Sequence, residues 1–157
     1  MDKLPYLTAA LLCEKVLEEK SGTLSAVRII DRLEYELQTN VPELAKLDIK
    51  PIIPFTALIC LKSGPVVGKV KVSFDGIRPS GKSKRLITLE VDLKGGDQGQ
   101  NLVLNMGITV EEEGLHWFEV RVDEALLTKI PLMLVPKPVQ VLNSPAPQET
   151  TDHTERQ

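Results

Sequence analysis

Histidines and cysteines are the side chains of this chain best suited to chemistry, and they are few. The 157 residues include two histidines, His116 and His153, and two cysteines, Cys13 and Cys60. His153 falls in a polar C-terminal segment, so His116 is the one histidine expected in a folded region. A nucleophilic Cys–His pair needs an exposed thiol in an electropositive setting. Both cysteines lie in apolar runs, so we expect them to be buried and expect no catalytic residues.

Sequence motifs for metals and cofactors are also missing. Two isolated cysteines and one histidine cannot complete a tetrahedral zinc site. The chain has no Gly-x-Ser-x-Gly nucleophile elbow, no phosphate-binding Gly-Lys-Thr loop and no dinucleotide fingerprint. The glycine-rich run 95–99 joins two expected strands and opens no helix, so it lacks the dipole that binds phosphate. We therefore expect no metal, no cofactor and no enzymatic activity.

One expected loop is strongly basic. Its eight residues from position 78 to 85 hold four cations, which are Arg78, Lys82, Lys84 and Arg85. Such a cluster could bind an acidic partner or a phosphate group. The alternative is a solvated loop without a ligand, because loops are generally polar and exposed.

The segment around the single tryptophan offers a second candidate interface. Residues 116–122 alternate, with His116 and Phe118 among the positions that face inward. We expect His116 to be packed and hydrogen-bonded, since buried polar groups survive when paired. Leu115 and Trp117 then face outward and form the best apolar patch for a partner or a self-contact. In the alternative, a neighbouring loop, the connector or the tail covers Trp117.

These candidates sit on elements whose apolar residues repeat with a period of two. Successive strand side chains point to opposite faces, so the alternation indicates strands with one buried face. Eight strands are expected: 8–20, 23–37, 55–62, 66–74, 86–93, 102–110, 116–122 and 126–135. Short strands at regular spacing without long helices predict an antiparallel two-sheet β-sandwich, immunoglobulin-like with Greek-key connections. Pro131 inside the last strand indicates a sheet edge, because proline cannot donate to a ladder.

The first strand is ambiguous by composition. Residues 8–20 are rich in helix formers, but the turn signal Ser21-Gly22 and the strand-like run after it favour a hairpin. That hairpin would place Val16 opposite Val27 and Cys13 opposite Ile30. The alternation slips at Ile29-Ile30, which predicts a β-bulge. A turn of helix is expected over 42–47, in the connector.

Composition bounds the class of protein. Residues 1–136 are expected to form one β-sandwich domain, and residues 137–157, rich in proline and polar groups, a disordered tail. A net charge of −3 and 4% aromatic residues disfavour nucleic acid as a partner.

The apolar run from Leu4 to Leu12 is too short to span a membrane. We expect a cytoplasmic protein, with a Cys13–Cys60 disulfide left open as a possibility.

Several of these segments carry a family resemblance. Ala10–Glu14, the turn Ser21-Gly22 and Leu24–Asp31 resemble a family of small uncharacterised bacterial β-sandwich proteins, a domain of unknown function. Gly114–Asp123 and Ile130–Leu132 are similar to the last hairpin of that family. The resemblance covers most of residues 6–135. It implies a β-sandwich and a bacterial or phage origin, supports a strand for the first segment, and assigns no activity or site residue.

The sequence favours a non-catalytic module for protein–protein interaction. The partner would be an unknown protein, or a second copy through an edge strand. The contacts would come from Leu115 and Trp117, or from the basic loop with Arg78, Lys82, Lys84 and Arg85. The alternative is a domain that binds a small ligand with the loops at one end of the sandwich.

Overall fold

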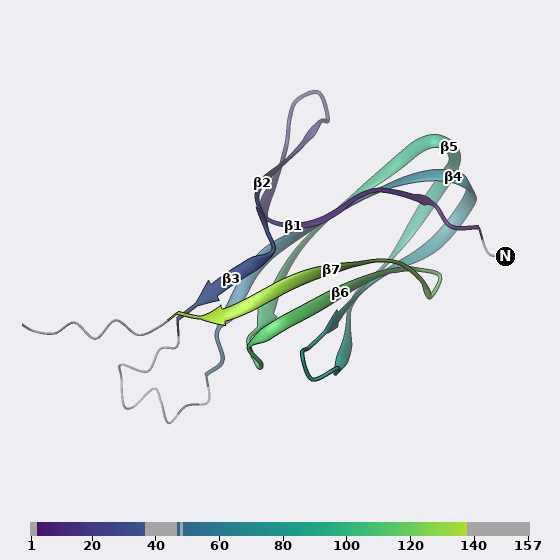
Figure 1. Ribbon diagram of the computed structural model, residues 1–157. Coiled ribbons are helices and arrows are strands. Elements are labelled where there is room, and N and C mark those ends of the chain that lie inside the picture. The colour runs from purple at the N-terminus through teal and green to yellow at the C-terminus, as the bar shows by residue number, and fades with distance from the viewer. Residues whose placement is uncertain (1–2, 37–46, 48, 138–157) are drawn as a thin grey trace, which may run out of the picture.

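Strands account for every regular element in the described part of the chain. The computed structural model describes residues 3–36, 47 and 49–137. The seven strands are β1 (Tyr6–Glu18), β2 (Leu24–Ile30), β3 (Arg32–Tyr35), β4 (Ile52–Ile77), β5 (Ser83–Thr109), β6 (Gly114–Val122) and β7 (Ala125–Pro136) (Figure 1). The all-β class is confirmed, including a strand rather than a helix at the N-terminal segment.

Hydrogen bonds join the seven strands into one mixed sheet. Its order is β2-β1-β4-β6-β7-β3, and β5 pairs with β4 alone. All of these pairs are antiparallel except β3 with β7, which is parallel. The expectation of two separate antiparallel sheets with eight strands is corrected accordingly.

Glycines explain why the four strands expected between residues 55 and 110 form two long strands, β4 and β5. Gly64 in β4 and Gly95 and Gly96 in β5 have positive φ angles of 54°, 81° and 64°. The β4–β5 register shifts on both sides of Gly64 and then resumes. Glycine adopts positive φ at no steric cost, so these residues bend the ladder and do not end it. We call Ile52–Lys62 with Gly99–Thr109 the first arm, and Val67–Ile77 with Ser83–Lys94 the second arm.

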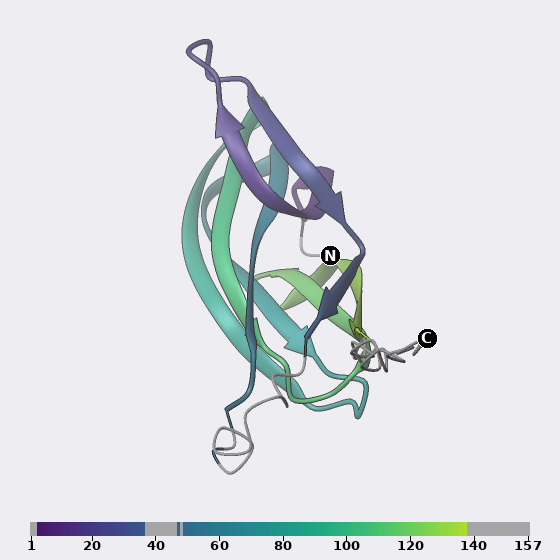
Figure 2. The same cartoon turned by 90° about the vertical axis from the view of Figure 1, so that its left-hand side faces the viewer.

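The bend brings the two arms to face each other around the core. β1 and β2 extend the first arm, and β6, β7 and β3 extend the second (Figure 2). The ring centroids of Phe55, in the first arm, and Phe118, in β6, are 5.4 Å apart. Phe118 also stacks on Phe74 at 5.2 Å. These strands are not hydrogen-bonded neighbours at Phe55, so the contact crosses the interior.

The first hairpin differs in register from the sequence prediction. Val16 lies opposite Ala26 and Cys13 opposite Ile29, one residue away from the expected pairs. The turn explains the shift, because Glu19 donates its N–H to the carbonyl of Thr23 and closes a loop of three residues. The sequence prediction is based on a turn of two residues, Ser21-Gly22.

The slip at Ile29-Ile30 is not a bulge. β2 ends at Ile30, and β3 starts at Arg32 and pairs with β7 instead of β1. The slip therefore marks the point where the chain leaves one partner strand for another. The connector helix expected over 42–47 and the tail expected over 137–157 lie outside the described residues, with two exceptions. Leu47 is in a turn, and Lys137 donates its N–H to the carbonyl of Tyr35.

The prediction that the strand with Pro131 lies at a sheet edge is correct for only part of β7. β7 pairs with β6 along its length and with β3 at residues 133–136. The last strand is therefore interior at its C-terminal end, where β3 supplies a second partner. Pro131 precedes that stretch, so its missing N–H interrupts no pairing with β3.

Both cysteines are free thiols. β1 and β4 are neighbours, but Cys13 lies opposite Thr56 and Cys60 opposite Ala9. This offset of four residues is about 13 Å along a strand, well beyond the roughly 7 Å between Cα atoms that a disulfide tolerates. The open possibility of a bridge is thereby excluded.

No helix in the described ranges is long and apolar enough to cross a membrane.

Candidate functional site

The start of β6 presents a different site on each face. Leu115 and Trp117 point outward and are each 37% exposed, as the alternation predicted. His116 and Phe118 point inward and are buried. The strand therefore separates an outer apolar surface from an inner pocket.

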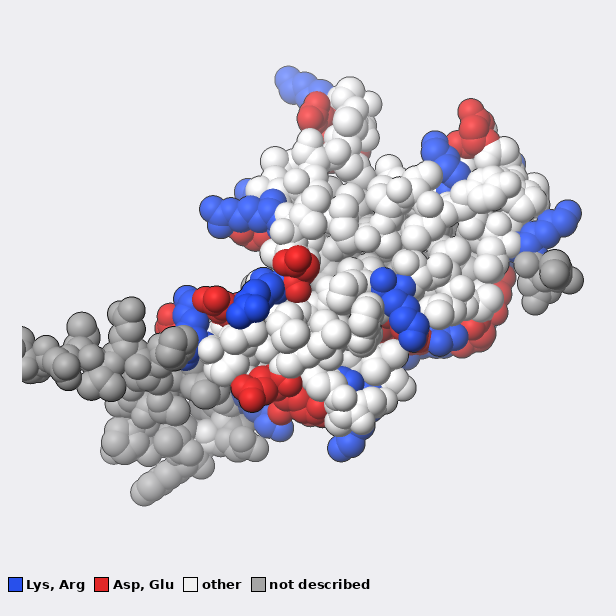
Figure 3. All heavy atoms as spheres, in the orientation of Figure 1, with Lys and Arg blue, Asp and Glu red and all other residues white. Residues whose placement is uncertain are grey.

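Strand pairing extends the outer surface to both neighbours of β6. Trp117 pairs with Ile77 of β4 on one side and Pro131 of β7 on the other, and Leu115 pairs with Met133. Paired residues lie on the same face of a sheet. We define the outer patch by these five side chains: Ile77, Leu115, Trp117, Pro131 and Met133. Figure 3 shows an uncharged area over β6 and β7 that charged groups border.

Further along the same face, a network of ion pairs borders the outer patch. Glu119, opposite Lys129 on β7, accepts from Lys129 at 2.8 Å and from Arg121. Hydrogen bonds from Lys129 and Arg121 lower the pKa of Glu119. Arg121 also lies 3.6 Å from Asp75. An apolar centre with a polar border is the usual layout of a protein-binding surface.

The cations of the basic loop differ in their ion-pair partners. Arg85 donates to Asp75 at 2.8 Å and to Glu124 at 2.6 Å, and thereby joins the network on the outer face. The hydrogen bonds from Arg85 lower the pKa of Glu124. Arg78 forms an ion pair with Glu111. Within the described residues, Lys82 and Lys84 have no ion-pair partner. Two of the four cations, Arg78 and Arg85, are thus held in ion pairs with acidic residues of this chain.

Hydrogen bonds connect the acidic turn after β5 to the basic loop. Ser80 donates its N–H and its hydroxyl to Glu112, at 2.9 and 2.6 Å. These bonds lower the pKa of Glu112. Together with the Arg78–Glu111 pair, they fix the loop at 78–82 against the turn at 111–113. This contact holds the loop after β4 and the turn after β5 together.

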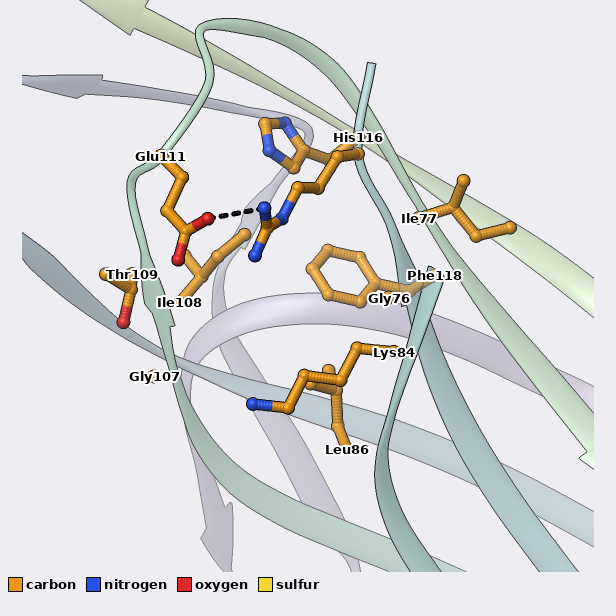
Figure 4. Close-up of a pocket in the computed structure, with 11 residues that line it drawn as sticks. Gly76, Ile77, Lys84, Leu86, Gly107, Ile108, Thr109, Glu111, His116 and Phe118 are labelled. Atoms are coloured by element: carbon orange, nitrogen blue, oxygen red, sulfur yellow. Dashed lines mark ion pairs between the residues drawn. The ribbon is translucent and has the colours of Figure 1, made fainter. Parts of the chain in front are cut away.

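A pocket of about 140 Å³ lies next to these loops, at the ends of both arms remote from the glycine bend. We call it the end pocket (Figure 4). Gly76–Arg78, Lys84 and Leu86 come from the second arm and its loop, and the side chain of Ile77 points away from the pocket in Figure 4. Residues 107–109 come from the first arm. Its remaining lining residues are Glu111, His116 and Phe118.

His116 is 3% exposed and forms one wall of the end pocket. Its Nδ1 lies 3.1 Å from the carbonyl oxygen of Gly114. A carbonyl can only accept, so Nδ1 carries the proton and donates. In the neutral ring, Nε2 is then an acceptor. The prediction of a packed, hydrogen-bonded histidine is confirmed.

Sequence reasoning missed several members of both sites. Ile77, Pro131 and Met133 belong to the outer patch through strand register, which the local pattern did not contain. Leu86 and residues 107–109 meet at the end pocket because β4 and β5 bend back. One sequence feature could have indicated the contact between the two loops. The run Glu111–Glu113 is acidic and the loop at 78–85 is basic, and opposite charges attract.

No group of three or more His, Cys, Asp or Glu side chains in the described ranges is placed to hold a metal ion.

Comparisons with known proteins identify no family for this chain. No family model matches the chain, and no curated protein matches it. Among solved structures, it is similar to the Pseudomonas fluorescens alkylpurine DNA glycosylase AlkC bound to DNA containing an abasic site analog. The match covers 80% of this chain and 30% of that protein, at 11% identity and a TM-score of 0.39. The chain thus spans less than a third of that protein.

This comparison corrects the exclusion of nucleic acid as a partner. The exclusion rested on net charge and aromatic content, which are averages over the chain and do not describe a local surface. A similar solved structure is that of a protein bound to DNA, and composition alone does not exclude nucleic acid as a partner of this chain. A likeness of this size assigns no DNA binding to the present chain.

Proposed function

We propose that this protein is a non-catalytic binding module whose outer patch docks weakly and reversibly on another protein. The observation that carries the proposal is the exposed pair of Leu115 and Trp117 at the centre of the outer patch. Tryptophan is the residue type most enriched among energetic hot spots of interfaces. A half-exposed tryptophan held on a rigid strand loses little further freedom on binding.

The size of the outer patch favours a transient partner over a stable dimer. Trp117 exposes 37% of its surface, which is roughly 90 Å² for a side chain of about 250 Å². Stable interfaces bury about 800 Å² on each partner. The five side chains fall well short of this area, so the patch suits a small anchor contact with a different protein.

The charges beside the outer patch indicate what the partner presents there. Glu119 is held by Lys129 and Arg121, and Asp75 and Glu124 are held by Arg85. Because these charges already neutralise one another, the partner needs no strong charge of its own. We infer an apolar knob or ridge with a polar margin as the matching surface.

The cysteines and the interior aromatic contact bear on the location and the packing that we propose. Two free thiols are typical of a reducing compartment, which supports a cytoplasmic location. The Phe55–Phe118 contact across the interior supports a sandwich-like packing of the two arms, of the immunoglobulin-like kind.

Photocrosslinking in the source cells tests the docking surface. A photoreactive amino acid placed at 133, inside the outer patch, should capture one protein that can be identified, purified and titrated. Trp117→Ala should weaken the purified complex about 10- to 100-fold. Leu126→Ala is the matched control, because Leu126 is 42% exposed on β7 but lies outside the patch. Equal loss of affinity in both variants, or no loss in either, would contradict the proposal.

A further inference from the structure

The end pocket lies on the opposite face of β6 from the outer patch, and the proposed docking does not use it. It is lined by residues of both arms and of β6, and by Arg78 and Glu111, which form an ion pair between the two loops. Ligand sites are typically concave, mostly apolar and supplied with a few polar groups. The walls fit this description, since Leu86, Ile108 and Phe118 are apolar.

The charges at its mouth leave one cation in excess. Arg78 and Glu111 both line the end pocket and neutralise each other. Lys84 also lines it and has no ion-pair partner among the described residues. In Figure 4 the Lys84 side chain extends toward the segment that carries Gly107, with its ammonium at the free end. A single unmatched positive charge at the opening favours a ligand with one negative charge.

The volume limits the size of the ligand. About 140 Å³ is close to the roughly 150 Å³ of a cavity that accommodates benzene. It is too small for most drug-sized ligands, whose pockets begin at about 300 Å³. One ring or one branched aliphatic group therefore fills it.

We propose that the end pocket binds a carboxylate carried on a small apolar body. The body packs against Phe118, Leu86 and Ile108, and the ammonium of Lys84 receives the carboxylate. Such a group could be a free small acid or the C-terminal residue of a polypeptide with an apolar side chain. The binding chemistry is the same for both sources.

Benzoate is the probe for the free acid, and benzamide is its uncharged control of nearly equal shape. Titration of the full chain, followed by amide chemical shifts in NMR, should move signals from 76–78, 84–86 and 107–109 with benzoate and much less with benzamide. A short peptide ending in phenylalanine, compared with its C-terminal amide, probes the other source. Tighter binding of the free-acid peptide than of benzoate identifies a polypeptide terminus, and the reverse identifies a free acid.

Two variants test the assignment to this pocket. Lys84→Gln should weaken benzoate about three- to five-fold, the value of a solvent-exposed charge pair, while Lys82→Gln in the same loop should leave affinity unchanged. Gly76→Ala should weaken binding, because its new Cβ would lie 3.4 Å from Leu86 Cδ1 and 3.6 Å from Phe118 Cε1. Those are ordinary contacts, so the variant should fold with its pocket partly filled.

Three results would overturn the proposal. These are equal shifts with benzoate and benzamide, equal weakening by the two lysine variants, or no shifts at 76–78 and 84–86 up to the solubility limit of the acids.

Discussion

The contact between Phe55 and Phe118 gives the sharpest test of how the sheet folds over. The two rings lie 5.4 Å apart with planes inclined by 51°, and both side chains are buried. Phe55 pairs with β5 in the first arm, whereas Phe118 pairs with Gly76 in the second. Direct contact between them therefore exists only if the arms face each other.

A double-mutant cycle with Phe55→Leu and Phe118→Leu measures this contact. Leucine keeps most of the volume, so each single variant should lose about 1–3 kcal/mol and stay folded. An aromatic pair contributes about 0.5–1.5 kcal/mol beyond the area it buries. The double variant should therefore lose about 0.5–1.5 kcal/mol less than the two singles added together.

Urea unfolding followed by circular dichroism supplies the four free energies. Independent sites usually add within about 0.3–0.5 kcal/mol. A Phe55–Phe118 coupling inside that range would refute the inference that the arms pack face to face. The pair Phe55 and Leu115 serves as control, because Leu115 lies on the outer face of β6 and should show no coupling.

Three further predictions concern stability and reactivity. Gly64→Ala should cost about 1–3 kcal/mol in thermal or urea unfolding, because Gly64 has φ of 54° and its new Cβ would lie 2.6 Å from Tyr6 Cε2. Gly22→Ala, with φ of 82° in open space, should cost less, and equal costs would contradict the role of Tyr6. The pKa of Glu119 is lowered by Lys129 and Arg121, so its stabilisation is complete above the unfolded pKa of about 4.3 and is lost as pH falls through the folded value. Urea midpoints measured from neutral to acidic pH should fall less steeply in Glu119→Gln, and identical profiles would disprove this contribution. Burial raises the pKa of both thiols, and of the two only Cys60 is partly exposed. A thiol reagent should therefore modify Cys60 before Cys13, which mass spectrometry can follow. The reverse order would count against the fold.

Local alternation correctly predicted which side chains of β6 face outward. Leu115 and Trp117 lie on the surface, and His116 and Phe118 lie inside, because the period of two depends only on neighbouring residues. The final hairpin of β6 and β7 followed from the same signal. Thus the centre of the outer patch could be found from the sequence.

Bends and long-range pairing could not be predicted in the same way. Gly64 and Gly95 act as breakers in a sequence, but a positive φ inside a continuing ladder bends a strand without ending it. The parallel pairing of β3 with β7 depends on residues about a hundred positions apart in the chain, such as Arg32 and Met133. The end pocket depends on that same global geometry, since its two walls come from opposite arms.

Fluorine NMR of Trp117 tests the proposed docking most directly. Trp117 is the only tryptophan in the chain, so incorporation of 5-fluorotryptophan places a single reporter in the outer patch. Addition of the purified, unlabelled partner should shift this resonance and reduce its solvent-isotope shift, because the indole leaves water. An unchanged resonance at saturating partner would show that the protein binds through some other surface.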